Sequence, residues 1–186
     1  MLWTSGGPYR AWADHLDAWA DERVPVDPAL PRLVPADFAA ETWTRLVERI
    51  RQALDRRLHH WSRLLTAAMA EASDEFSVGR ALVQARAGLR EIRAMAGHPG
   101  LPADLRDRLR DAIDDQIRDA QNSLEQQVEN MRRQGVDPRL TEARLRAVRD
   151  SSLVAALDAP PPAAGPDPDP WRLDPAARPR RRVITD

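Results

Sequence analysis

Two reactive side chains are missing from this chain of 186 residues, which contains neither cysteine nor lysine. The absence of cysteine excludes disulfide bonds, a thiolate nucleophile and zinc sites with cysteine ligands. The absence of lysine excludes a Schiff-base amine and the phosphate-binding lysine of glycine-rich nucleotide loops. All 28 residues counted as lysine plus arginine are arginine, so several common enzyme chemistries are excluded from the outset.

Aromatic residues make up only 5% of the chain, and the formal net charge is −1. Low aromatic content together with 42% hydrophobic and 31% charged residues is typical of a soluble helical protein. A net charge near zero gives no overall attraction to nucleic acid or to acidic membranes. No run approaches the roughly 20 apolar residues of a membrane span, and the N-terminal residues lack a basic segment followed by an apolar one. We therefore expect a cytoplasmic protein with no membrane partner.

Prolines and glycines divide the chain into helical segments. Of the 16 prolines, eight lie from residue 160 onward, and most of the others mark the limits of segments with helical periodicity. Three parts follow: an aromatic helix with a proline-rich strap (1–35), a helical bundle (36–158) and a tail rich in proline and arginine that we expect to be disordered (159–186). The predicted fold is all-α, an elongated bundle of four to five helices followed by that tail.

The N-terminal helix, expected over residues 8–22, carries an aromatic stripe. Trp12, Leu16 and Trp19 recur at helical spacing on one face, with aspartates on the opposite face. The strap that follows is too apolar for a solvated linker, so we expect it to lie on the bundle in an extended conformation. A short aromatic helix on such a tether either closes the bundle by internal packing or docks into a partner, and both interpretations stay open.

Two long segments, residues 35–73 and 102–134, share an apolar repeat of eleven residues. A repeat of about 3.67 residues per turn keeps a helix nearly straight. The apolar positions of the first segment are Val47, Ile50, Leu54, Leu58, Trp61, Leu65, Met69 and Ala72. Those of the second are Leu109, Ile113, Ile117, Ala120, Leu124, Val128 and Met131. Each segment is thus predicted to form one long amphipathic helix.

Two shorter helices are expected after the long ones. A new apolar stripe starts at Val78, out of phase with the stripe before it, so we expect a break at residues 73–78 with Asp74 among the candidate caps. Whether the two helices are continuous there stays open. A last helix is expected over residues 138–157, with Ser151 as a second candidate end.

No set of residues indicates a catalytic, metal or cofactor site. The four histidines are scattered over three segments, and Asp55 with His59 forms a pair at i, i+4 spacing. A metal site needs further ligands at matching spacing, and the sequence does not supply them. Carboxylates are abundant, but no pair of them stands out. We therefore predict a noncatalytic protein without cofactors.

Charged stripes follow the backs of the two long helices. Arginines form one stripe opposite the apolar face of the first helix. Its members are Arg45, Arg49, Arg56 and Arg63. Acidic residues form the other stripe, which also faces outward. Its members are Asp104, Asp107, Asp111, Asp114, Asp115, Glu125 and Glu129. Such stripes are either solvated helix backs or complementary surfaces for self-association, and steep salt dependence would accompany the second.

The C-terminal tail carries two candidate motifs. Trp171, followed by Arg172 and Leu173, has no core to join in a segment rich in proline and aspartate, so it is a candidate docking motif. A basic cluster near the end can contact phosphates. The cluster contains Arg180, Arg181 and Arg182. Aspartates flank it and no aromatic residue is interleaved with it, which weakens a nucleic-acid role.

The sequence favours a noncatalytic helical adaptor or assembly protein that binds a protein partner through helix faces and the tail motif. The candidate contacts are the aromatic stripe, the arginine stripe and the two tail motifs. One alternative is a nucleic-acid-associated protein that uses the arginine stripe and the terminal arginines. Another is an enzyme with an unrecognised carboxylate site, which a buried acidic pair in a pocket would reveal.

Overall fold

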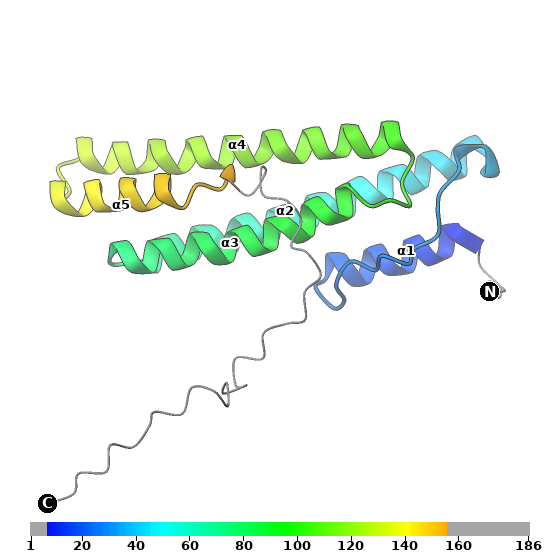
Figure 1. Cartoon of the computed structure of the whole chain (residues 1–186), viewed down its shortest axis with the longest axis horizontal. Helices are drawn as coiled ribbons and strands as arrows, with labels where there is room; N and C mark the ends of the chain where they lie inside the picture. The colour runs from blue at the N-terminus through cyan, green and yellow to red at the C-terminus, as the bar shows by residue number, and fades with distance from the viewer. Residues whose placement is uncertain (1–6, 156–186) are drawn as a thin grey trace, which may run out of the picture.

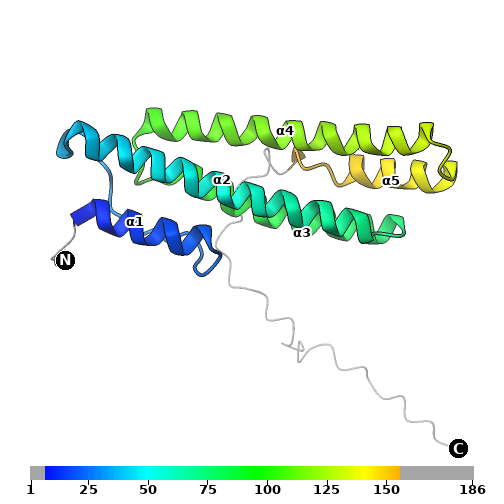
Figure 2. The same cartoon turned by 180° about the vertical axis from the view of Figure 1, so that it is seen from behind.

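The computed structural model describes residues 7–155 as an elongated bundle of five α-helices, and this part of the chain contains no strand. The elements are α1 (Gly7–Ala20), the 3-10 helix η1 (Pro35–Asp37), α2 (Ala40–Glu71), α3 (Glu75–Ala96), α4 (Ala103–Arg133) and α5 (Pro138–Asp150). In Figure 1, α4 and α5 lie side by side along the top, α2 and α3 cross the middle, and α1 lies below. Figure 2 shows the bundle from behind, with α2 nearer the viewer than α3. The predicted all-α fold is confirmed.

Helix α2 begins at Ala40 and not at residue 35, which corrects the predicted start. Pro35–Asp37 forms η1, and Phe38 then has extended backbone angles (φ −119°, ψ 145°). Ala39 is also extended, so the α-helix starts only after it. From there α2 runs without interruption for 32 residues.

The predicted break between the second and third helices lies at residues 72–74, so α2 and α3 are separate helices. The Ser77 amide donates a hydrogen bond to the Asp74 carboxylate (2.7 Å), and the Asp74 amide donates to the Ser77 hydroxyl (3.1 Å). This reciprocal capping box satisfies amide groups that have no partner within the first helical turn. The hydrogen bond from the Ser77 backbone also lowers the pKa of Asp74.

Helix α5 ends at Asp150, at the earlier of its two predicted ends. Beyond it, Leu153 is fully buried, and its amide donates to the side-chain oxygen of Gln121 on α4 (2.9 Å). Arg86 of α3 donates from Nε to the Ser151 carbonyl (3.1 Å). The chain after α5 is therefore held against both α3 and α4.

The apolar stripes of the long helices form the core, although the stripe of α2 is rotated from its predicted position. On α4 the buried positions follow the predicted pattern closely. They are Leu105, Leu109, Ile113, Ile117, Gln121, Leu124 and Val128. On α2, the predicted core positions Val47, Trp61 and Met69 are only half-buried. Ala53 and Arg57 are buried instead, because α2 contacts α1 on one side and α3 on another.

The proline-rich segment between α1 and η1 connects α1 to the loop before α4. The Trp12 indole N–H donates to the Pro31 carbonyl (2.8 Å). His98 in the loop is 1% exposed, and its Nε2 hydrogen-bonds with the Asp27 carbonyl (2.9 Å). The Gly100 amide donates to Nδ1 of the same ring (3.0 Å). These buried contacts hold α1 and the segment after it in place against the bundle.

Candidate functional site

A cleft of about 290 Å³ lies between α2 and α3. Apolar side chains form most of its walls. Its lining residues are Glu22, Arg57, Trp61, Leu64, Leu65, Ala68, Ala81, Gln84, Ala85, Gly88 and Ile92. Leu64 is 56% exposed, and it places apolar surface on the rim where solvent reaches it.

One end of the cleft is acidic, and we call Glu22, Arg57 and Glu91 its acidic end. Arg57 is only 7% exposed, and it forms ion pairs with Glu22 and with Glu91 (2.7 Å). Its guanidinium carbon also lies 5.2 Å from the centroid of the Trp19 ring. Both glutamates are about half exposed. Two carboxylates face one buried guanidinium, and His60 Nε2 lies 3.5 Å from Glu22; the carboxylates outnumber the arginine at this end.

A close contact between the two helices shapes the middle of the cleft. The Trp61 indole N–H, on α2, donates to the Ala85 carbonyl on α3 (2.9 Å). A Cβ atom on Gly88 would lie only 3.0 Å from Cδ1 of Trp61, so glycine lets the indole ring approach α3 closely. Trp61 is thus held as a wall of the cleft by a hydrogen bond and by its fit against Gly88.

The cleft is small, and its lining is mostly apolar. A volume of about 290 Å³ lies at the lower edge of the range of about 300–1,000 Å³ that is typical of pockets for drug-sized ligands, and it also accommodates one large side chain. Within residues 7–155 no group of three or more histidine, cysteine, aspartate or glutamate side chains is placed to hold a metal ion. Asp55 and His59 line a separate shallow hollow together with Asp119 of α4.

The aromatic stripe of α1 lies in the core, which corrects its assignment as a candidate contact with a partner. Trp12, Leu16 and Trp19 are each 0% exposed. They pack against α2 and the proline-rich segment. Of the two interpretations that the sequence left open, the structure shows internal packing, and these side chains offer no surface to another molecule.

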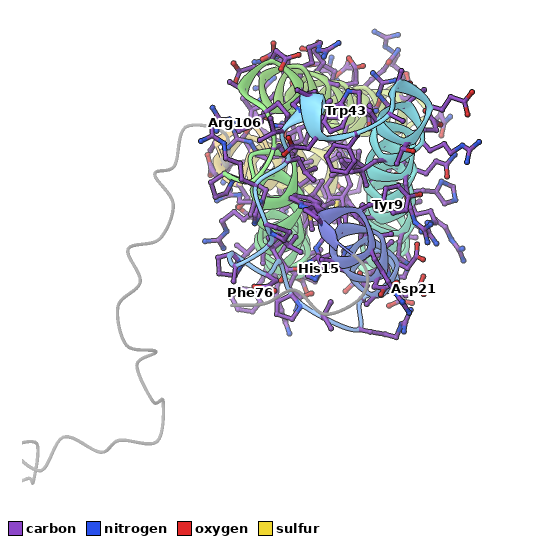
Figure 3. The ribbon with its side chains drawn as sticks, turned by 90° about the vertical axis from the view of Figure 1, so that its right-hand side faces the viewer. Tyr9, His15, Asp21, Trp43, Phe76 and Arg106 are labelled. Carbon is purple, nitrogen blue, oxygen red and sulfur yellow. The ribbon has the colours of Figure 1, made fainter. Side chains whose placement is uncertain are left out.

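Two members of the arginine stripe pair with carboxylates at the edge of α1, and their side chains stay partly exposed to solvent. Arg49 and Arg56 form ion pairs with Asp17 of α1, the second at 3.3 Å. Arg56 also lies 3.7 Å from Asp21. The hydrogen bond from Arg49 holds the pKa of Asp17 below its usual value. Figure 3, a view along the bundle, shows Asp21 on the side of α1 that faces α2.

The outer members of the same stripe have different environments. Arg45 is exposed and lies 3.6 Å from Glu41 on its own helix. Arg63 is exposed. Single exposed arginines of this kind are ordinary solvated positions on a helix surface.

The acidic stripe of α4 also contains one inward-facing member. Asp114 is only 18% exposed, and it accepts two hydrogen bonds from Arg93 of α3, at 2.8 and 3.1 Å. Its assignment to the outward stripe is therefore corrected. Asp104 pairs with Arg108 on the surface of the same helix (2.9 Å).

Both tail motifs, Trp171–Arg172–Leu173 and the cluster of Arg180, Arg181 and Arg182, lie outside the described residues. The cleft itself was not identified by the sequence reasoning. The feature of the sequence that could have indicated the cleft is Arg57. It lies three residues after Leu54 and four before Trp61, which places an arginine on the apolar side of the helix, where arginine is uncommon. An arginine in a buried stripe indicates a carboxylate partner from another element, here Glu22 and Glu91.

No helix in the described range is long and apolar enough to cross a membrane. Comparisons of the chain with protein-family models, with curated proteins and with solved structures found no match.

Proposed function

We propose that the chain is a noncatalytic helical adaptor that binds a protein partner through the cleft between α2 and α3. The observation that carries this proposal is the cleft itself, an apolar hollow of about 290 Å³ with the exposed side chain of Leu64 on its rim. Protein interfaces commonly take most of their binding energy from one or a few large side chains buried in such hollows.

The surroundings of the cleft support a protein as the ligand. Trp61 and Arg57 line its floor and one end, and residues of these two types are enriched among the strongest contributors to interfaces. The half-exposed glutamates at the acidic end supply a polar rim. An apolar centre with a charged edge is the usual arrangement of a specific binding surface.

The arrangement of the arginine stripe supports the adaptor over a nucleic-acid-binding protein. Phosphate binding needs arginines that are available to release counterions on contact. Arg49 and Arg56 already pair with carboxylates of α1. These two arginines are therefore less available to bind a phosphate backbone than unpaired arginines are.

The proposal is tested by two matched substitutions on the tagged full-length chain. Leu64 lines the cleft, whereas Val83 lies on the outer side of α3, and their exposed fractions are nearly equal at 56% and 54%. We expect the wild-type chain and Val83→Arg to capture the same stoichiometric protein from a lysate of the source organism. Leu64→Arg should lose it, because the charged side chain blocks the apolar rim.

Circular dichroism and urea unfolding of both variants provide the folding control, since both substitutions are at exposed positions. Equal capture by the two folded variants would overturn the cleft as the binding surface. A wild-type chain that retains no protein at stoichiometric yield would overturn the adaptor function.

A further inference from the structure

We infer that the cleft between α2 and α3 binds a segment of this same chain, residues 169–173, with the indole of Trp171 in the apolar centre. The inference rests on the proposed role of the cleft as a binding surface for protein side chains. The tail motif then binds the bundle of the same molecule, so a protein partner and the tail compete for the cleft. Three features of the described residues carry the inference: size, charge and position.

The first feature is the match in size and polarity. A cleft of about 290 Å³ with mostly apolar walls is suited to one large aromatic side chain, and burial of a tryptophan removes about 150–250 Å² from water. Trp171 is the single tryptophan beyond residue 61. Prolines at 168 and 170 restrict the backbone beside it, which reduces the conformational entropy lost on docking.

The second feature is the order of charges along the cleft. Its acidic end lies beside Ile92. At the opposite end Arg80 precedes the lining residue Ala81; it is exposed, and its guanidinium carbon lies 5.1 Å from the centroid of the Phe76 ring. The tail has the complementary order, with Asp169 before Trp171 and Arg172 directly after it. Arg172 can therefore face the acidic end while Asp169 faces Arg80.

The lengths of cleft and tail also agree. From Arg57 to Ala68 the cleft follows α2 over twelve residues, whose eleven steps cover about 16 Å at 1.5 Å per residue. An extended backbone from Asp169 to Arg172 covers about 9 Å at 3.1 Å per residue. The two charged side chains extend this span toward both ends. The orientation of the docked segment is thus fixed by charge.

The third feature is the position from which the tail starts. Leu153 is fully buried, and Arg86 of α3 binds the Ser151 carbonyl, so the tail leaves the bundle from a fixed point beside α3. Trp171 lies sixteen positions after Ala155, and six of the fifteen residues between them are proline; an extended proline-rich chain of that length reaches at most about 50 Å at 3.1 Å per residue. This exceeds the 10–12 Å diameter of the helix that the tail must pass.

A tether of this length makes docking intramolecular. A linker that can span to a site gives the tethered segment an effective concentration set by its length and stiffness, so the tail competes for the cleft at every protein concentration. A partner then has to displace Trp171, which raises the partner concentration needed for binding. Docking of the tail is in this way a device that sets the affinity of the adaptor.

Disulfide formation can test this inference without interference from native thiols, because the chain contains no cysteine and only the introduced thiols can react. Pro170→Cys is combined with Gln84→Cys on the cleft rim, or with Val83→Cys as the matched control. Residues 83 and 84 are adjacent and exposed, but Val83 does not line the cleft. Val83 lies one turn from Arg86, nearer the start of the tail, so an undirected tail would reach it at least as often.

We expect the disulfide within one chain to form at least about tenfold faster between residues 84 and 170 than between residues 83 and 170, because docking raises the local thiol concentration. Adding Trp171→Ala to the first pair should reduce its rate to that of the control. Adding Arg172→Glu should also slow it, since the charge at the acidic end then becomes repulsive. Peptide mapping distinguishes disulfides within one chain from those between chains.

Equal rates for the two pairs would overturn the inference, as would a rate that does not respond to Trp171→Ala. Disulfides formed between chains would show that the tail of a second copy occupies the cleft, which also overturns docking within one chain. The outcomes are separable from the capture experiment. Equal disulfide rates, together with capture that depends on Leu64, would contradict docking of the tail and leave the adaptor proposal standing. Unequal disulfide rates, together with capture that does not depend on Leu64, would contradict binding of a partner in the cleft and leave docking of the tail standing.

Discussion

Gly100 lies at a close contact between α1, the proline-rich segment and the loop before α4. A Cβ atom at this position would lie 3.0 Å from Nδ1 of His98, 3.0 Å from the Pro31 carbonyl oxygen and 3.1 Å from Cζ2 of Trp12. Two of these neighbours are a backbone carbonyl and a fully buried ring, so neither can move away easily. Glycine is therefore required by close approach at this point.

Substitution of Gly100 by alanine is expected to lower the free energy of unfolding by about 1–3 kcal/mol, the usual cost of overfilling a packed core. Gly79→Ala is the matched control, because a Cβ atom there meets nothing within 4 Å. In the helical context of α3 this control should raise stability by about 0.5–1 kcal/mol. Urea unfolding of both variants measures the difference, and equal shifts would contradict the close-contact argument.

His15 makes the stability of the contact between α1 and the proline-rich segment sensitive to pH. Burial lowers the pKa of His15 below its ordinary value of 6.5, Asp27 opposes this shift, and His98 adds to it. The Asp27 amide donates to Nε2 of the ring (3.4 Å), a bond that needs the neutral imidazole. Between the folded and the unfolded pKa the unfolded chain binds more protons, so stability rises with pH in that interval. This contribution is complete above pH 6.5 and is lost as the pH falls below it.

We therefore expect the wild-type chain to lose stability relative to His15→Gln as the pH falls from about 7.5 to about 5.5. The glutamine variant has no group at this position that titrates in the range. Urea midpoints of both proteins, compared at each pH, isolate the contribution of His15. A stability difference that stays constant across the range would contradict the assignment.

At the scale of elements, α1 is held by two kinds of contact with different strengths. Its buried apolar face is formed by Trp12, Leu16 and Trp19. Its edge is joined to α2 by ion pairs of Asp17, whose side chain is 41% exposed. Exposed ion pairs contribute little because water screens them, so the apolar face determines whether α1 stays docked.

Leu16→Ala is expected to lower the free energy of unfolding by about 2–5 kcal/mol, because it leaves a cavity at a fully buried position. Asp17→Asn should cost less than about 1 kcal/mol, the usual limit for an exposed ion pair. Since the pKa of Asp17 is lowered, its contribution is present above the unfolded value of 3.8 and is lost below it. Denaturation at neutral pH measures both costs, and an equal cost for the two variants would contradict this ranking.

At the scale of the whole molecule, some members of both charged stripes pair with residues of the same bundle. Arg49 and Arg56 pair with Asp17, and Asp114 pairs with Arg93 across α3 and α4. These pairs use arginines from one predicted stripe and an aspartate from the other. Fewer opposite charges then remain to bring two copies together side by side.

We expect the full-length chain to sediment as an elongated monomer at both low and high salt. Attraction between charged stripes would be screened as the ionic strength rises from about 0.05 M to about 0.5 M, so an assembly held by them would dissociate. Sedimentation velocity at the two salt concentrations provides the measurement. A larger species at low salt that dissociates at high salt would support self-association through the stripes.

Local information in the sequence determined the helical class and most of the helix limits. The eleven-residue repeat of α4 matches its buried face because the repeat places the apolar residues on one side of the helix, and only that side is buried. Asp74 caps α3 as expected because capping depends on residues within one turn. The late start of α2 was missed because Phe38 and Ala39 adopt extended angles that helix propensity does not reveal.

Only the tertiary structure decided which stripes are surfaces and which are contacts. Arg49 and Asp114 have the spacing of solvated residues, yet each is paired with a side chain distant in the sequence. The cleft likewise depends on how α2 and α3 lie against each other, with Trp61 seated on Gly88. Periodicity along one helix specifies its faces, whereas the identity of the neighbour on each face depends on packing between elements. For this reason the sequence predicted the helices but not the site between them.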